Sequence, residues 1–260
     1  MTLHWATAQA LAENYHAFVH LVDGNGHPIA QEDHIPGPLF APPASWTPGR
    51  SYTDAYLLRV PADAPGGVYW PEVGIYTYGD QERLPAYADA ASQQANVRTD
   101  AVRLSPLKIV GETRRPSPQR PLQARVGDTF EVLGYDITAL DQRVHPGDTV
   151  TLTLYYRSIA PTSADLTRFV HLYAPALGMA AQHDSPPTDG LNPTSAWRPG
   201  EIITDRVTLT VNTDAVPGTA HLLLGFYDAA AGAERIPVFD AEGAPLPDAA
   251  LPLAEVEIAP

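Results

Sequence analysis

The sequence Phe-Val-His-Leu at positions 18–21 recurs at positions 169–172, which lie 151 residues further along the chain. The same offset carries Trp-x-Pro-Gly from 46–49 onto 197–200, and Thr-Asp from 53–54 onto 204–205. Between positions 3 and 76 the comparison needs no gap, and 22 of 74 residues are identical to their counterparts. We therefore expect two copies of one folding unit within the 260 residues of the chain.

The clearest strand signal lies in the second copy, at positions 149–156, where Thr-Val-Thr-Leu-Thr-Leu-Tyr-Tyr alternates and is rich in β-branched residues. Further short strands, separated by Pro- and Gly-rich turns, are expected at positions 17–22, 51–60, 69–76, 101–109, 130–135, 167–173, 202–211, 220–227 and 253–258. This pattern predicts an all-β chain that forms two tandem antiparallel β-sandwiches, immunoglobulin-like or jelly-roll-like. Positions 88–97 are rich in Ala and Gln, which fits either a short helix or an extended loop.

The repeat also predicts the domain boundaries. We expect a first sandwich at 1–110, a Pro- and Arg-rich linker at 111–124, and a second, complete sandwich at 125–260. Met1 aligns with Leu152, so the first sandwich is expected to lack its N-terminal strands. An open sheet edge invites pairing with another chain, which predicts self-association of the first domain or its earlier melting.

Composition narrows the classes of function. The formal net charge is −14, which argues against a nucleic-acid partner. The chain has no cysteine, which excludes disulfides and thiolate metal sites. No apolar run is long enough to span a membrane, so we expect no membrane insertion by this chain. We expect no cofactor and no metal.

His20 and His171 are the most suggestive polar residues of the repeat. Each lies between apolar residues on one face of an expected strand, a pattern typical of a histidine in or near the core. Asp33 and Asp184 follow 13 residues later in the two copies. Such a pair could prepare a general base or a metal ligand, or it could be a buried cross-strand contact that fixes the register. We predict that each histidine contacts its aspartate.

Trp46 and Trp197 precede the Pro-Gly turns, and Asp54 and Asp205 follow on the next strand. A tryptophan ring can stack on the apolar face of a sugar while carboxylates bond its hydroxyls, so these four residues are candidates for a glycan site. The alternative is a tryptophan that packs over its turn and caps the core. Pro followed by Gly at the centre of the turn favours type II geometry.

Two further groups carry weaker signals. Asp184, Asp189 and Asn192 offer oxygen ligands that could suit calcium, although solvated acidic loops explain them as well. Arg83 and Arg235 each follow a glutamate and could fold inward onto a carboxylate. The motifs of serine hydrolases, zinc proteases and nucleotide-binding proteins are missing, and we expect no catalytic residues.

The order FVHL, Q-x-D, W-x-P-G, T-D and E-R-[LI]-P resembles the β-sandwich repeats found in the extracytoplasmic parts of large bacterial membrane proteins. Many of those proteins are similar to polytopic, lipid-sugar-using glycosyltransferases, especially in filamentous green bacteria. The resemblance covers the second copy nearly whole and the first from its second strand onward. It implies a surface-exposed accessory module that is anchored by a segment outside this chain, and it carries over no catalytic residues.

Three hypotheses follow from these observations. The chain is a non-catalytic module that binds a glycan or a cell-envelope protein, a structural spacer, or an enzyme with a site of unfamiliar form. Exposed tryptophans would favour binding, and fully buried tryptophans and histidines would favour the spacer. A cleft that holds His20 or His171 beside a carboxylate of raised pKa would favour an enzyme.

Overall fold

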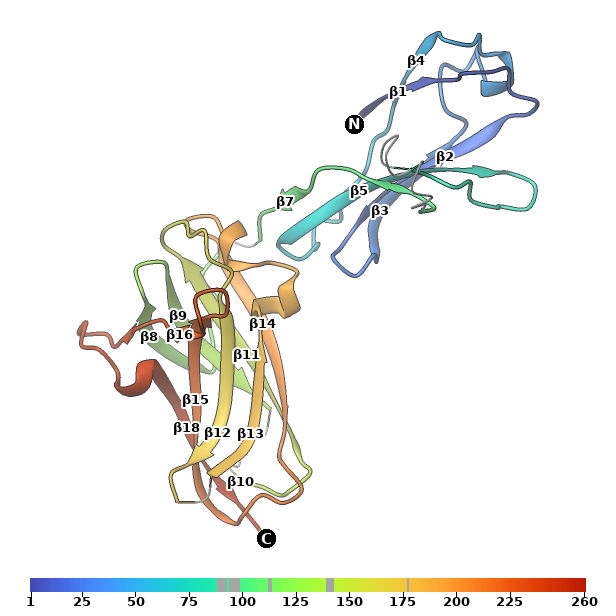
Figure 1. Ribbon diagram of the computed structural model, residues 1–260. Coiled ribbons are helices and arrows are strands. Elements are labelled where there is room, and N and C mark those ends of the chain that lie inside the picture. The colour runs from blue at the N-terminus through green and yellow to red at the C-terminus, as the bar shows by residue number, and fades with distance from the viewer. Residues whose placement is uncertain (88–92, 94–98, 112–113, 139–142, 177) are drawn as a thin grey trace. The chain divides into compact units, whose positions relative to one another are not determined.

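The computed structural model describes residues 1–87, 93, 99–111, 114–138, 143–176 and 178–260 (Figure 1). These residues form two compact units, Met1–Ile109 (unit 1) and Val110–Pro260 (unit 2). The regular elements are strands, apart from short 3₁₀ turns, which confirms an all-β chain with antiparallel sheets. The segment 88–97, for which the sequence fits a short helix or an extended loop, lies outside the described residues except for position 93.

Unit 2 contains two sheets with a shared core between them. One sheet has the order β14-β11-β9-β8-β17, and the other has the order β10-β18-β15-β12-β13 with β16 added to β15. All pairings are antiparallel except the short parallel contact of β10 with β18. The strand bounds are β8 Arg120–Val126, β9 Phe130–Ile137, β10 Arg143–Val144, β11 Thr149–Ser158, β12 Thr167–Ala174, β13 Gly178–Ser185, β14 Ile202–Thr210, β15 Gly218–Asp228, β16 Glu234–Arg235, β17 Val238–Phe239 and β18 Ala250–Ile258.

The core of unit 2 follows from strand alternation. In β11 the residues Val150, Leu152, Leu154 and Tyr156 all point inward, and the last three are 0% exposed. They pack against inward residues of β9, β12, β14 and β15 in one continuous cluster. The connections hold three 3₁₀ turns, which are η2 Pro187–Gly190, η3 Thr194–Ala196 and η4 Pro247–Ala249.

Unit 1 has one larger and one smaller sheet. The larger has the order β3-β2-β5-β6 with β7 added to β5, and the smaller consists of β1 and β4 (Figure 1). The bounds are β1 Thr2–Ala6, β2 Tyr15–Val22, β3 Pro28–His34, η1 Pro43–Ser45, β4 Ser51–Ala55, β5 Gly67–Thr77, β6 Val102–Arg103 and β7 Leu107–Ile109. The strand expected at 101–109 is thus split, because Ser105-Pro106 interrupts it.

The expected linker at 111–124 is partly wrong. Its last residues form β8, which pairs with β9. Pro121 fits in this strand because it lies opposite Gly134, where the register shifts. A side chain at Gly134 would lie 2.5 Å from the Arg120 carbonyl, so the glycine lets the two strands approach. Sequence patterns also missed β3 and β13, which are polar and poor in β-branched residues.

Candidate functional site

Trp46 and Trp197 are core residues and not an exposed stacking platform. They are 7% and 3% exposed. Each indole N–H donates to a carbonyl five residues earlier, Ala41 at 2.7 Å and Asn192 at 2.8 Å. The ring of Trp197 also stacks on Tyr156 at 5.7 Å between centroids. The glycan site predicted around these rings is therefore wrong, because a ring that faces the core cannot reach a sugar.

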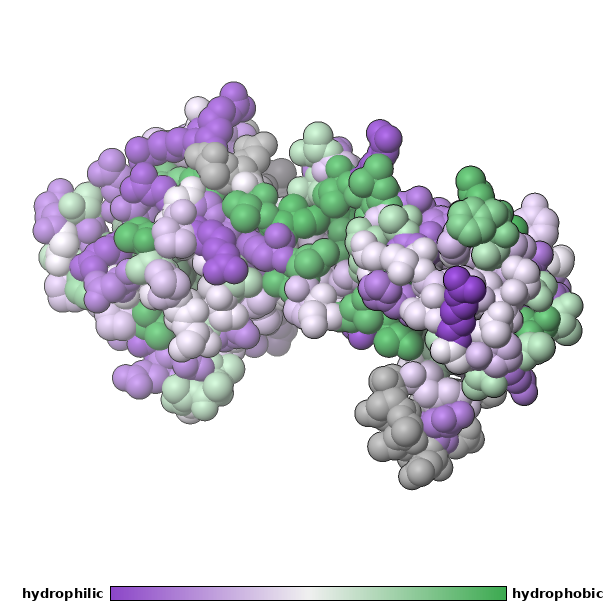
Figure 2. Space-filling model, turned by 90° about the horizontal axis from the view of Figure 1, so that it is seen from above, coloured by the Kyte–Doolittle hydropathy of each residue, from purple (hydrophilic) through white to green (hydrophobic). Residues whose placement is uncertain are grey.

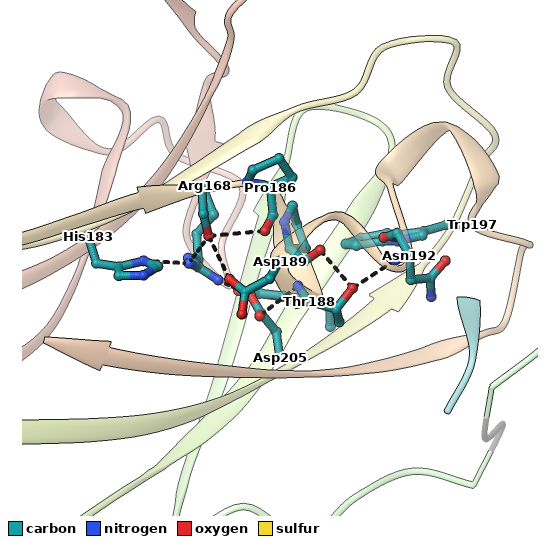
Figure 3. Close-up of polar contacts among 11 residues, drawn as sticks. Arg168, His183, Pro186, Thr188, Asp189, Asn192, Trp197 and Asp205 are labelled. Carbon is teal, nitrogen blue, oxygen red and sulfur yellow. Dashed lines mark hydrogen bonds and ion pairs between the residues drawn. The ribbon is translucent and has the colours of Figure 1, made fainter. Parts of the chain in front are cut away.

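Asp205, on β14, is the centre of a buried polar cluster and is not free to bind a ligand (Figure 3). One carboxylate oxygen accepts hydrogen bonds from the Arg168 guanidinium and from the Tyr156 hydroxyl, the latter at 3.1 Å. The other accepts from the Thr188 backbone N–H at 2.8 Å. The side chains of Arg168 and Asp205 are both 0% exposed. The predicted binding role of Asp205 is therefore wrong.

Arg168 extends this cluster from β12 to β13. Its guanidinium donates to Nδ1 of His183 at 2.9 Å and to the Ser185 hydroxyl at 2.7 Å. Because arginine only donates, Nδ1 of His183 is the acceptor in this contact. Burial, together with the charge of Asp205, raises the pKa of Tyr156 well above its ordinary value, so this phenol stays protonated and donates. The cluster joins the two sheets and orders the loop that begins at β13.

Unit 1 keeps the aspartate of this cluster but changes its cation. Asp54 accepts from the Gly37 backbone N–H at 3.0 Å, which is the contact that matches Thr188 in unit 2. Ala17 stands where unit 2 has its arginine, and His34 lies 2.9 Å from Asp54 instead. The His34 ring stacks on Tyr56 at 4.3 Å. Asp54 is therefore a loop anchor, and the prediction that it binds glycan is also wrong.

A second constellation lies on the outer face of the larger sheet in each unit. In unit 2 the Phe169 ring covers Gly225 of the neighbouring strand, and the Arg235 guanidinium lies over the ring at 4.6 Å. An added Cβ at Gly225 would be 2.1 Å from the ring, so only glycine fits. Unit 1 repeats this arrangement with Phe18, Gly74 and Arg83, at 4.4 Å between guanidinium and ring.

The two His–Asp contacts extend this outer-face constellation. His171 lies 2.9 Å from Asp184, and His20 lies 3.4 Å from Asp33, which confirms the predicted contacts. The histidines lie on the face opposite the core, because Val19 and Val170 point inward and strand neighbours alternate. The His171 side chain is 14% exposed and Asp184 is 35% exposed, so solvent reaches the pair.

Two matched tyrosines border these pairs. Burial, followed by the charge and hydrogen bond of Asp184, raises the pKa of Tyr227. Burial and then the charge of Asp33 raise the pKa of Tyr76. Each unit thus carries Arg, Phe, His, Asp and Tyr on the outer face of its larger sheet, which accounts for many residues of the sequence repeat.

Unit 2 has a groove of about 340 Å³ over this face. Its floor is apolar, with Leu223 of β15 and Pro252 of β18. Tyr173, on β12, is 37% exposed beside it. Polar groups come from His171 and from Arg235, whose guanidinium donates to the Asp248 carbonyl at 2.8 Å. The remaining lining residues are Phe169, Met179, Pro247 and Ala250.

The same place in unit 1 has different chemistry. Glu72 and Arg103 occupy the positions of Leu223 and Pro252 and form an ion pair of 2.7 Å. The Arg103 guanidinium lies over Trp70 at 5.4 Å. The apolar floor is therefore a property of unit 2, although both units share the Arg–Phe–His–Asp constellation.

The remaining sequence candidates are dispersed. Asp184 contacts His171, Asp189 accepts from Ser185 at 3.3 Å, and the buried Asn192 amide donates to Glu201 at 3.2 Å. The described residues contain no group of three or more His, Asp or Glu side chains that could hold a metal. Asn192 is 2% exposed, so the prediction that this residue lies in a solvated loop is wrong.

The prediction of an arginine folded inward onto a carboxylate is correct only in part. Arg83 binds a carboxylate, with Asp100 at 2.8 Å, but both side chains are exposed, so the arginine does not fold inward. Arg235 binds the Asp248 backbone carbonyl instead. The residues that sequence reasoning missed are Arg168, Tyr173 and Leu223, none of which is repeated in unit 1. The sequence contains one signal for Arg168, because a charged residue directly before FVHL interrupts an apolar strand and indicates a buried polar contact.

We expect Gly225→Ala to destabilise unit 2 by about 1–3 kcal/mol, because the new methyl group must displace the Phe169 ring. Calorimetric melting of the full chain measures this. Gly79→Ala is the matched control, since its Cβ meets nothing within 4 Å. Equal melting profiles for the two variants would show that Gly225 is not needed for ring placement.

Comparisons with known proteins identify no family. No family model and no curated protein matches the chain. Among solved structures it is similar to a Corynebacterium diphtheriae protein whose name describes it as membrane anchored, at 12% identity and a TM-score of 0.21. The match covers 100% of this chain and 61% of that one, so this chain spans less than two thirds of its length. At this TM-score the likeness carries no argument about fold or function.

None of the described helical segments has the length and apolar character of a membrane span.

Proposed function

We propose that this chain is a non-catalytic accessory module that binds glycan through the outer-face groove of unit 2. Its two units are tandem immunoglobulin-like or jelly-roll-like β-sandwiches in this proposal. By the resemblance of its repeated motifs, the module belongs to the extracytoplasmic part of a membrane glycosyltransferase-like protein. A segment outside this chain would anchor it.

The observation that carries this proposal is the groove that combines an apolar floor with an exposed aromatic ring and polar groups. A sugar presents an apolar face that packs on Tyr173 and Leu223, and hydroxyls that bond His171, whose ring contacts Asp184. A volume of about 340 Å³ is at the small end for ligand sites, which suits one or two sugar residues of a longer chain.

The lining also supports binding over catalysis. His171 and Asp184 form a pair that could act as a general base, but the described residues of the groove include no serine, threonine, cysteine or lysine as a nucleophile. Arg235 is engaged with a backbone carbonyl and the face of Phe169. The groups that remain accessible are suited to hold hydroxyls.

A glycan array followed by calorimetric titration tests this function. We expect the full chain to bind at least one bacterial envelope glycan, and we expect Tyr173→Ala to weaken it by on the order of 5–50-fold, as loss of an aromatic contact does. Tyr78→Ala is the matched control, because Tyr78 is 68% exposed and lies in unit 1. Equal weakening by both variants would contradict a groove site, and binding only to an envelope protein would replace glycan as the ligand.

A structural spacer is the second candidate, and the burial of Trp46 and Trp197 favours it. The contacts that the repeat preserves best are the indole N–H to carbonyl bonds, the aspartate loop anchors and the phenylalanine over glycine. These contacts stabilise the fold, and none of them offers a group that could bind a ligand. The complete absence of glycan and protein binding would leave the spacer as the function.

A further inference from the structure

Unit 2 has a second cavity, of about 430 Å³, on the outer face of the sheet β14-β11-β9-β8-β17. Strand alternation explains its lining. Tyr156 and Val132 point into the core, so their neighbours Arg157 and Glu131 point outward. This sheet is not the one that carries the groove with Leu223, so the two sites are separate.

The strand register aligns charged side chains in one row across this face. Arg157 of β11 lies opposite Glu131 of β9, which lies opposite Arg125 of β8. Phe239 of β17 continues the row opposite Arg125, whose guanidinium lies over the phenyl ring at 4.6 Å. One carboxylate thus stands between two arginines, and the aromatic ring holds the second arginine in place.

A third arginine and a turn complete the lining. Arg115 precedes β8 and forms no ion pair with any described residue. In the turn at 240–243, Oδ1 of Asp240 accepts from the backbone N–H groups of Glu242 at 3.1 Å and Ala244 at 2.8 Å. The Asp240 carboxylate is therefore engaged within its own turn.

The convergence of three guanidinium groups is unusual in a chain whose formal net charge is −14. Hydrophilic side chains cover much of the visible surface of unit 2, purple in Figure 2, so a polar surface alone does not indicate a site. Arginines gathered in one cavity do, because their like charges repel unless an anion lies among them.

The two paired arginines can exchange their present partners for a ligand. Arg157 lies 2.5 Å from Glu131, and these side chains are 41% and 32% exposed. Asp128, which pairs with Arg125, is 93% exposed. Ion pairs in contact with solvent contribute little to stability, so a ligand anion can replace either carboxylate at little cost.

We propose that this cavity is a binding site for an anionic carbohydrate whose charged group is a carboxylate or a phosphate. A guanidinium donates two parallel hydrogen bonds to either group, a stronger contact than a neutral hydrogen bond. Gln123 and Glu242 also line the cavity and bond hydroxyls, and Leu133 supplies an apolar surface for ring carbons. Arginines mixed with carboxylate and amide groups suit a sugar that carries one charge and several hydroxyls.

NMR titration of the full chain tests this site with three probes, which are trigalacturonate, its methyl ester and glucose 1-phosphate. The first two differ in charge, and the third offers phosphate in place of carboxylate. We expect one or both anionic probes to perturb the amides at 131–133, 157 and 241–243, and the ester to perturb none of them. The stronger of the two anionic probes identifies the charged group.

Arg157→Gln is expected to weaken binding of the anionic probe on the order of tenfold, because it removes one charge-assisted contact. Arg206→Gln is the matched control, since Arg206 is exposed on β14 of the same sheet and lies outside the cavity. Both substitutions change the net charge equally, and both positions are in contact with solvent, so both variants should fold.

A loss of affinity of the same size in both variants would overturn the proposal. Binding of the methyl ester as tightly as the acid would do so as well, as would a failure of both anionic probes to perturb these amides. Perturbations confined to the surroundings of Tyr173 and Leu223 would assign the probe to the groove and would also contradict a second site.

Discussion

Asp205→Ala is expected to destabilise unit 2 by about 3–5 kcal/mol, because it leaves the Arg168 guanidinium buried without its counter-ion. The Thr188 backbone N–H and the Tyr156 hydroxyl lose their acceptor in the same substitution. Chemical denaturation that resolves the two units measures the loss. Asp54→Ala, the matched change in unit 1, should cost less because its partner His34 is partly exposed.

A double substitution separates the free-energy cost of the unpaired buried charge from the cost of losing the loop contacts. Arg168→Met combined with Asp205→Ala removes the unpaired charge, so it should recover part of the stability that the single substitution loses. The alanine at the matching position of unit 1 shows that the fold tolerates an apolar residue there. Equal losses for the single and double variants would show that the ion pair contributes nothing beyond the loop contacts.

Trp197→Ala is expected to destabilise unit 2 by about 3–5 kcal/mol, the usual cost of removing a buried tryptophan. The ring contacts Tyr156 and Phe130, and its N–H anchors the loop at Asn192. Calorimetry of the full chain should show a lower transition for unit 2 and an unchanged one for unit 1. Trp46→Ala should lower the unit 1 transition instead.

A different pair of results for Trp197→Ala would contradict the assignment of this tryptophan to the core. If Trp197→Ala leaves the melting of unit 2 unchanged and removes ligand binding, the ring is a binding platform, and its assignment to the core is wrong. A variant that melts early and keeps its ligand at low temperature fits the core assignment.

The internal repeat made the matched contacts predictable. His171 and Asp184 were identified because the same pair recurs at the same offset, and two independent copies rarely keep a spacing without a shared contact. The same alignment predicted two folding units, and the described residues divide into two compact units after Ile109.

The direction in which strand residues face was harder to predict. Strand β2 has apolar residues on both faces, with Val19 and Leu21 on one and Phe18 and Val22 on the other. Alternation defines two faces, but it does not say which one meets the second sheet. The phenylalanine is buried on the outer face because Arg83 covers it, a contact that depends on a turn far along the chain.

The groove could not be predicted for a related reason. Its floor places Leu223 beside Pro252, which are far apart in sequence and meet only through the register of β15 and β18. The register shifts between Leu222 and Leu223, and no local pattern indicates such an irregularity. Neither residue is repeated in unit 1, so the alignment of the two copies gave no signal.

The most direct test of the central claim is a chemical-shift map of the full chain with the best glycan from the array. The proposed function predicts that the perturbed amides cluster around Tyr173, Leu223, Arg235 and Ala250 at the groove of unit 2. It predicts no comparable change around Trp46 or Trp197. Perturbations centred on the two tryptophan loops, or equal perturbations in both units, would contradict the claim that the groove of unit 2 is the binding site.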